Sequence, residues 1–210
     1  LASDTPGYFI AHWSLQFIVD RQGAIAAAGH AVGRPVPRIF DEIANTPMVS
    51  IAANNGQAWG GGAELSWACD LRIAAESATY GQPEVGLGII PGAGGTTRLA
   101  RLIGPTKCLE MILDGRPISA SEARQLGAIN KVVPDADLES ETRQWAALLA
   151  QKSPVALQIA KKAFYAAADL DYYKSFEYMN EAFARLCSTE DAVEGISAFK
   201  ERRAPVWKEK

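Results

Sequence analysis

The chain of 210 residues is poor in the residues that build cross-linked or metal-stapled proteins. It contains three cysteines and two histidines. The cysteines, Cys69, Cys108 and Cys187, are far apart and form no CxxC pair, so the sequence predicts neither a disulfide framework nor a zinc site. Without such a cysteine cluster, no metal is expected. Reduced thiols favour a cytoplasmic location.

Long apolar runs and an excess of positive charge are also missing. Glycine or charged residues interrupt every apolar stretch, so no membrane-spanning helix is expected, and no signal-peptide pattern opens the chain. The net charge of −3 gives no indication of a nucleic-acid partner. The chain begins at Leu1 rather than at a methionine, and we expect further residues to precede it in the native protein. What remains is the composition of an ordinary globular protein.

The first two thirds of the chain alternate short apolar runs with helical segments. Residues 47–53 and 71–74 have strand character, and the segment between them, residues 63–69, has helical composition. This order predicts a parallel sheet with helical crossovers. Two helices within residues 20–45 are expected to be separated by a break at residues 33–37.

Local signals mark further element ends. Thr96 is a candidate N-cap for a helix that carries Leu99 on its apolar face. Ser119 followed by Glu122 has the spacing of a capping box, and Gly127 suits the end of that helix. A last short strand is expected at residues 129–133.

From residue 138 onward the sequence is helical throughout. Phe176, Met179, Phe183 and Leu186 recur at helical spacing, which predicts an apolar stripe that packs either on the core or on another subunit. We therefore predict an α/β core over residues 1–137, lacking its N-terminal part, and a helical region over residues 138–210.

Four features could carry chemistry: the glycine triplet at residues 60–62, Glu64, Glu84 and the glycine-rich segment at residues 91–95. Taken singly, each has an ordinary explanation, such as a tight turn or a favourable charge at a helix start. Neither glycine cluster has the spacing of a Walker A loop or of GxGxxG. The chain has no GxSxG, which argues against a serine hydrolase.

Taken together, the four features favour acid–base catalysis. Glycines at a helix start expose backbone N–H groups that can stabilise negative charge on a carbonyl oxygen. Glu64 lies one turn further along the same helix. If Glu84 converges on it, one carboxylate can remove a proton while the other donates one. This arrangement suits the addition of water to a double bond conjugated to a carbonyl group.

Three segments resemble the enoyl-CoA hydratase/isomerase (crotonase) superfamily. They are IAANNGQAWGGGAELSWACDLRIA at residues 51–74, YGQPEVGLGIIPGAGGTTRL at residues 80–99 and FKERRAPVW at residues 199–207. The resemblance covers essentially the whole chain. It implies a spiral of ββα units with a C-terminal helical region that forms trimers or dimers of trimers.

The resemblance also implies roles for single residues. Glu64 and Glu84 match the glutamates that contact the catalytic water in hydratases, whereas family isomerases can manage with only the second. The backbone N–H groups of Gly61 and Trp13 match the oxyanion hole. The implied substrate-binding residues are Ala11, His12, Gly60, Gly92, Phe183 and Arg202, of which Phe183 and Arg202 help to hold coenzyme A.

This chain departs from the family pattern in its first oxyanion segment. His12 stands where glycine is usual, Ser14 replaces an aspartate, and Trp13 is bulky. A backbone N–H works whatever its side chain, so the oxyanion hole is retained, and Trp13 is expected to reshape the acyl pocket. The family's first strand–helix–strand unit, which carries a basic residue for coenzyme A, has no counterpart here.

The preferred interpretation is an enoyl-CoA hydratase that acts on an acyl-CoA thioester, with coenzyme A arriving as part of the substrate and no other cofactor. Two alternatives stay open. One is an enoyl-CoA isomerase or another acyl-CoA enzyme of the superfamily. The other is a non-catalytic protein that binds acyl-CoA or a protein partner.

Overall fold

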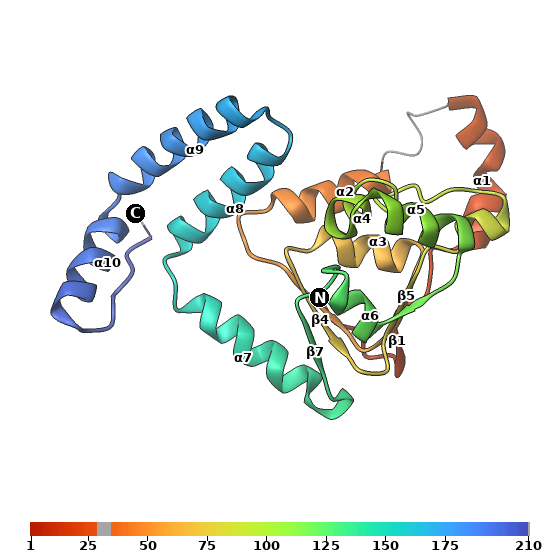
Figure 1. Cartoon of the computed structure of the whole chain (residues 1–210), viewed down its shortest axis with the longest axis horizontal. Coiled ribbons are helices and arrows are strands. Elements are labelled where there is room, and N and C mark those ends of the chain that lie inside the picture. The colour runs from red at the N-terminus through yellow and green to blue at the C-terminus, as the bar shows by residue number, and fades with distance from the viewer. Residues whose placement is uncertain (29–34, 210) are drawn as a thin grey trace. The chain divides into compact units, whose positions relative to one another are not determined.

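The computed structural model describes residues 1–28 and 35–209, and it separates into two compact units (Figure 1). The first unit comprises Leu1–Ala44 and Ser50–Arg143. The second comprises Asn45–Val49 and Gln144–Lys210. His30 lies outside the described residues.

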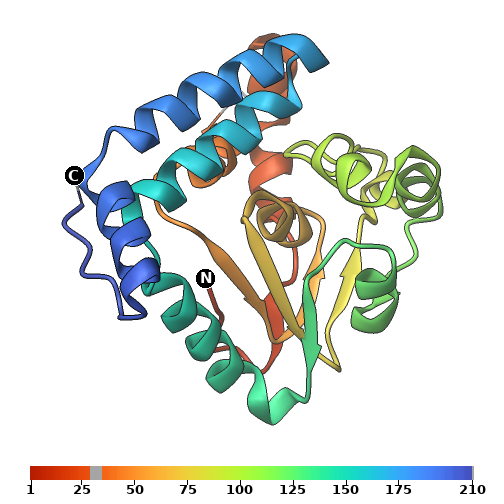
Figure 2. The same ribbon diagram turned by 60° about the vertical axis from the view of Figure 1, so that its left-hand side comes forward.

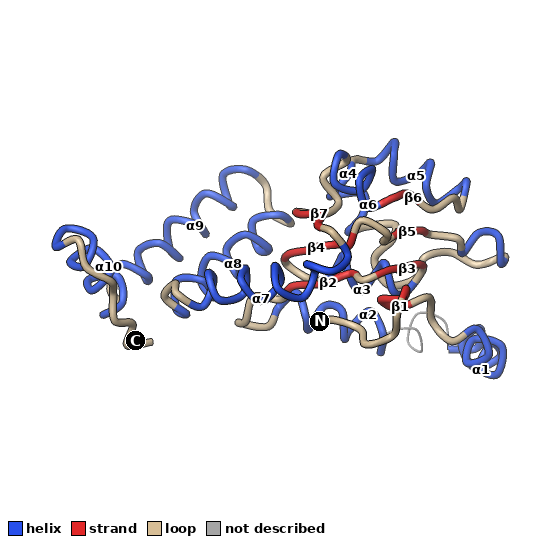
Figure 3. The backbone as a smooth tube through the Cα atoms, turned by 90° about the horizontal axis from the view of Figure 1, so that it is seen from below, coloured by secondary structure: helices blue, strands red, loops and turns tan. Residues whose placement is uncertain are grey.

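The first unit contains two sheets, which Figure 3 shows in red. The strand order of one is β1-β3-β5-β6 and that of the other is β2-β4-β7. The strands are β1 (Gly7–Ile10), β2 (Ile51–Asn54), β3 (Gly56–Trp59), β4 (Leu71–Ala75), β5 (Thr79–Gly81), β6 (Ile118–Ser119) and β7 (Lys131–Val133). Neighbouring strands run parallel except β5 and β6. From β1 to β5 successive strands alternate between the sheets, so the chain winds as a spiral. The predicted α/β class with parallel pairing is confirmed.

Strand β3 was not predicted from the sequence. It is only four residues long and begins with glycine, a residue that is depleted in strands. In the structure β3 pairs with β1 on one side and β5 on the other. Tertiary pairing therefore decides the conformation of this segment.

Helices and 3-10 turns connect the strands of the first unit. They are α1 (Leu15–Ala28), α2 (Pro35–Asn45), α3 (Gly61–Ala68), η2 (Glu84–Leu87), α4 (Arg98–Ile103), α5 (Pro105–Asp114), α6 (Ala120–Gln125) and η3 (Asp135–Asp137). Helix α1 begins before residue 20 and α2 begins inside the predicted break. The N-cap of α4 is Thr97 rather than Thr96. The capping box is confirmed, because Ser119 Oγ accepts a bond of 3.1 Å from Glu122 N.

Small and aromatic side chains fill the space around these sheets. Ala52, Ala58 and Ala74 are completely buried, and alanine at these positions lets the layers approach closely. On α3 and β5, the rings of Trp67 and Tyr80 pack with centroids 5.1 Å apart. This packing fixes α3, and with it the helix start, against β5.

The C-terminal part of the chain is helical, as predicted. It contains α7 (Leu138–Ala150), α8 (Pro154–Ala168), α9 (Tyr172–Cys187) and α10 (Glu190–Glu201), and α8 and α9 lie side by side (Figure 2). Side-chain oxygens of Ser153, Asp171 and Thr189 cap the last three helices. The stripe on α9 is exposed in the chain, with Phe176 at 49% and Phe183 at 66%.

Candidate active site

The junction of β3 and α3 requires glycine at two positions. Gly60 has φ of 51° and ψ of −127°, a conformation that other residues rarely adopt, and its N–H donates to Gly81 O at 2.9 Å. A Cβ on Gly62 would lie 1.8 Å from Ile10 O. The chain can therefore turn from strand to helix here only without side chains.

The structure brings Gly61 close to Trp13. A Cβ built on Gly61 would lie 3.6 Å from Trp13 N and 3.5 Å from its Cβ. Parallel pairing of β1 with β3 explains this approach, because both segments follow the same end of adjacent strands. The N–H of Gly61 opens α3, so the helix itself supplies no acceptor for it, and the helix dipole adds positive potential there.

The ring of His12 turns toward the backbone of its neighbour. His12 Nδ1 lies 2.7 Å from Trp13 O, and because a carbonyl only accepts, Nδ1 is the donor in this contact. Trp13 is 38% exposed, and its ring forms an edge contact with Phe17 at a centroid distance of 6.0 Å. The role of Ala11, His12 and Trp13 at the substrate stays a prediction.

Glu64 is buried and held by backbone donors. It lies in the first turn of α3 with 3% exposure. Its Oε1 accepts bonds from Ala93 N at 2.7 Å and Gly95 N at 2.9 Å. These bonds supply partners for a polar group that is buried away from water. Sequence reasoning flagged the glycine-rich segment but missed both donors.

The glycine-rich loop is itself braced by Arg98. Arg98 Nη1 donates to Ala93 O at 2.9 Å, and Nη2 forms an ion pair with Asp41 on α2. Gly92 is one of the residues predicted to bind substrate. It is exposed, and a Cβ there would meet no atom within 4 Å. The loop therefore holds Glu64 through two other residues and leaves Gly92 open.

Glu84 begins η2 and is 8% exposed. The pKa of its carboxyl group is raised to about 7, chiefly by burial; a backbone hydrogen bond lowers it and the nearby Glu64 charge raises it to a smaller extent. A Cβ on Gly60 would lie 3.0 Å from Glu84 Oε1. The two predicted glutamates and Gly60 therefore share one region of the first unit.

The remaining predicted residues lie in the second unit. Phe183 is an exposed residue of α9, and Arg202 is the left-handed C-cap of α10 with φ of 55°. Their role in binding coenzyme A stays a prediction.

Residues 1–28 and 35–209 lack two kinds of structural feature. No group of three or more His, Cys, Asp or Glu side chains is placed to hold a metal ion. Within the same residues, no helix is long and apolar enough to cross a membrane.

The family model for enoyl-CoA hydratase/isomerase matches residues 1–210. The chain belongs to this family. Among its relatives is a short-chain-enoyl-CoA hydratase of Clostridium acetobutylicum, 42% identical over 166 residues, which are 79% of this chain and 64% of that protein. A carnitinyl-CoA dehydratase of Salmonella typhi is 36% identical over 205 residues, or 96% of this chain and 77% of the relative.

Solved structures show that the enoyl-CoA hydratase/isomerase fold is shared. The crystal structure of an enoyl-CoA hydratase from Bacillus anthracis has a TM-score of 0.85 and 40% identity, and the match covers 92% of this chain and 75% of that one. The crotonase-like fold implied by the sequence is therefore confirmed. This family member spans 62% and 58% of the length of two curated relatives, from Bacillus subtilis and Dictyostelium discoideum.

Proposed function

We propose that this chain is an enoyl-CoA hydratase, an enzyme that adds water across the 2,3 double bond of an acyl-CoA thioester. The observation that carries the proposal is the pair of buried carboxylates, Glu64 and Glu84, beside the helix start at Gly61. Family membership and relatives named as hydratases support it. A cytoplasmic location is part of the proposal.

Thioester activation is assigned to backbone groups. The N–H groups of Gly61 and Trp13 bind the carbonyl oxygen of the thioester in the proposed complex. As water adds to the β-carbon, negative charge moves onto this oxygen, and donors fixed beforehand stabilise it without reorganisation. The dipole of α3 acts in the same direction. No metal or redox cofactor is required for this polarisation.

Glu64 is assigned as the base. It accepts a proton from water while the water oxygen bonds to the β-carbon. The N–H groups of Ala93 and Gly95 already bind its Oε1. The same bonds fix the orientation of the Glu64 carboxylate. A general base must first be correctly placed relative to the proton that it removes.

Glu84 is assigned as the acid. Because its pKa is about 7, a large fraction of this carboxyl group is protonated near neutral pH. It gives its proton to the α-carbon as the enolate electrons return. One O–C bond and one C–H bond form, and the product has gained one water. In dehydration the two glutamates exchange roles.

The isomerase alternative rests on Glu84 alone. A carboxyl group with a pKa of about 7 can remove a proton from one carbon of an enoyl chain and return it to another. Glu64 would then take no part in the proton transfer. A non-catalytic acyl-CoA-binding protein is the second alternative, and both carboxylates would then be dispensable.

Substrate binding and assembly are proposed on the same basis. Ala11, His12, Gly60 and Gly92 line the acyl pocket, and Trp13 narrows it. Phe183 and Arg202 hold coenzyme A. The exposed stripe on α9 forms the contacts of a homotrimer or a dimer of trimers. Light scattering of wild type and Phe176→Glu tests the assembly, which the added charge should weaken.

Turnover of crotonyl-CoA tests the function. Wild type should remove the absorbance of the conjugated thioester, and both Glu64→Gln and Glu84→Gln should abolish most of this activity. If only Glu84→Gln is inactive and a 3-enoyl-CoA is converted to the 2-enoyl isomer, the isomerase alternative holds. If wild type binds crotonyl-CoA without converting either substrate, the hydratase proposal is wrong.

A further inference from the structure

Gln82 is a buried amide that the mechanism above does not use. It lies between β5 and η2, two residues before Glu84, and its exposure is 0%. In the amide orientation that satisfies both ends of the group, its NH₂ donates to Glu84 Oε1 and to Oε2, each at 3.2 Å. A neutral donor therefore spans both oxygens of the proposed acid.

Gly95 prevents this amide from moving away. A Cβ on Gly95 would lie 2.5 Å from the Gln82 amide and 2.6 Å from Pro91 Cβ, so the backbone of the loop packs directly on the amide. The N–H of the same Gly95 donates to Glu64 at 2.9 Å. The loop residue that holds one glutamate thus also confines the side chain that holds the other.

The chemistry of an amide suits this place. A glutamine stays neutral at every pH, and its NH₂ can donate to a carboxylate. After half a rotation about its last side-chain bond, its carbonyl oxygen can accept from a carboxylic acid. A lysine would favour only the charged form of Glu84, and an apolar residue could form a hydrogen bond with neither form. Glutamine fits a carboxyl group that gains and loses a proton in each turnover.

We propose that Gln82 is the positioning residue of Glu84, holding that carboxyl group in place in both of its protonation states. This inference rests on the proposed function, in which Glu84 transfers a proton. Gln82 acts through Glu84 and touches no reacting atom. The loop at Gly95 couples its position to that of Glu64.

The main variant is Gln82→Met, which keeps the length of the side chain and removes both hydrogen-bonding ends. Loss of a donor to the carboxylate should raise the apparent pKa of Glu84 by about one pH unit. The kcat for crotonyl-CoA should fall about tenfold, and its KM should change less than about twofold, because binding is assigned to other residues. Tyr80→Phe is the control, since it alters a buried residue of the preceding strand whose hydroxyl has no partner among the described groups.

Two readouts separate this inference from the proposed function. The first, the pH profile of kcat, can be measured only if the enzyme turns over substrate. The second, NMR titration of ¹³C-carboxyl-labelled glutamate, requires no turnover, and Glu84→Gln assigns the signal. If wild type lacks hydratase activity but the Glu84 signal titrates higher in Gln82→Met, the function fails and the role of Gln82 stands. An unshifted signal, or an equal shift in Tyr80→Phe, overturns that role.

A second variant guards against a folding defect. Gln82→Glu has the shape of glutamine and places a second carboxyl group against Glu84, which should raise the Glu84 pKa more than methionine does. A lower melting temperature with an unchanged Glu84 titration in both variants would mean that Gln82 only fills space.

Discussion

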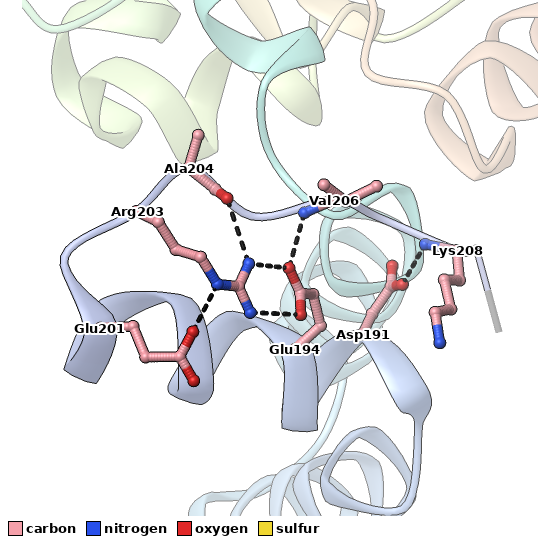
Figure 4. A network of polar contacts seen from close by, with 7 residues as sticks. All are labelled: Asp191, Glu194, Glu201, Arg203, Ala204, Val206 and Lys208. Atoms are coloured by element: carbon pink, nitrogen blue, oxygen red, sulfur yellow. Dashed lines mark hydrogen bonds and ion pairs between the residues drawn. The ribbon is translucent and has the colours of Figure 1, made fainter.

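Carboxylates in the two units of this chain meet opposite surroundings. In the first unit, burial raises the pKa of Glu84 to about 7. In the second, Arg203 donates to both oxygens of Glu194, at 2.6 and 2.9 Å, and lowers its pKa to about 2 (Figure 4). Near neutral pH, Glu84 therefore exists in both its protonated and its ionised form, whereas Glu194 is ionised.

The partners explain the difference. Glu194 is bound by a guanidinium and by Val206 N at 2.8 Å, and the neighbouring Asp191 accepts from Ser153 Oγ at 2.6 Å and Lys208 N at 2.7 Å. These bonds tie residues 204–209 to α10. The pKa of Asp191 is lowered, first by the bond from Ser153. The guanidinium of Arg203 lowers the pKa of Glu194, whereas burial raises the pKa of Glu84 toward the range that the proposed proton transfer needs.

Replacing each glutamate by glutamine should reveal the largest difference between the two carboxyl groups. Glu84→Gln should lower kcat for crotonyl-CoA by about 10³-fold, within the range for loss of an acid–base group, and leave the fold intact. Glu194→Gln should leave kcat unchanged but lower the melting temperature. Turnover and thermal unfolding on both variants check this. Equal losses of activity would contradict the division of roles.

The pH dependence of activity should follow Glu84. If Glu84 is the acid in hydration, kcat falls as pH rises through about 7, because the proton to be donated is lost. Dehydration needs the same single proton on the pair, placed on Glu64, so its rate should fall over the same limb. Initial rates from pH 5 to 9 in both directions measure this, and a hydration rate that does not fall through about 7 would refute the assignment.

Stability should depend on pH with opposite signs at the two carboxylates. The folded pKa of Glu194 is below its ordinary value of 4.5, so its contribution is present above pH 4.5 and lost as pH falls toward 2. The folded pKa of Glu84 is raised, so its contribution is present below pH 4.5 and lost as pH rises through 7. Glu194→Gln should flatten the acid side of a plot of melting temperature against pH, and Glu84→Gln the neutral side.

Ser153→Ala should have the smallest effect. It removes one of several donors to Asp191 and the N-cap of α8, so the melting temperature should fall by a few degrees. Crotonyl-CoA turnover should be unchanged. Ser140→Ala, on the exposed face of α7, is the matched control and should shift the melting temperature less.

Short-range patterns were the most informative part of the sequence. The capping box at Ser119 and the helical C-terminal third depend on neighbours in the chain, and both were predicted. Glu64 was singled out because it follows the glycine triplet, Glu84 because it follows a proline, and both because they match the motifs of the superfamily. Their catalytic roles stay predictions.

Long-range convergence could not be read in the same way. The N–H donors to Glu64 come from Ala93 and Gly95, and nothing in their own residue types marks a backbone donor. Gln82 lies within the quoted motif, but a glutamine in a loop is ordinarily exposed, and only the packing of Gly95 shows why it is buried. Strand β3 is a strand because it has partners on both sides.

The alternation of strands between two sheets also bears on how the protein is made. β1 pairs with β3 and not with the next strand in the chain, so Trp13 can approach Gly61 only after the residues between them have been synthesised. Pairings of this kind are slow because distant segments must meet before any contact rewards them. A nascent chain that stalls before residue 56 would therefore hold β1 and Trp13 without the strand that pairs with them. Mutations that weaken β1 should slow folding during translation.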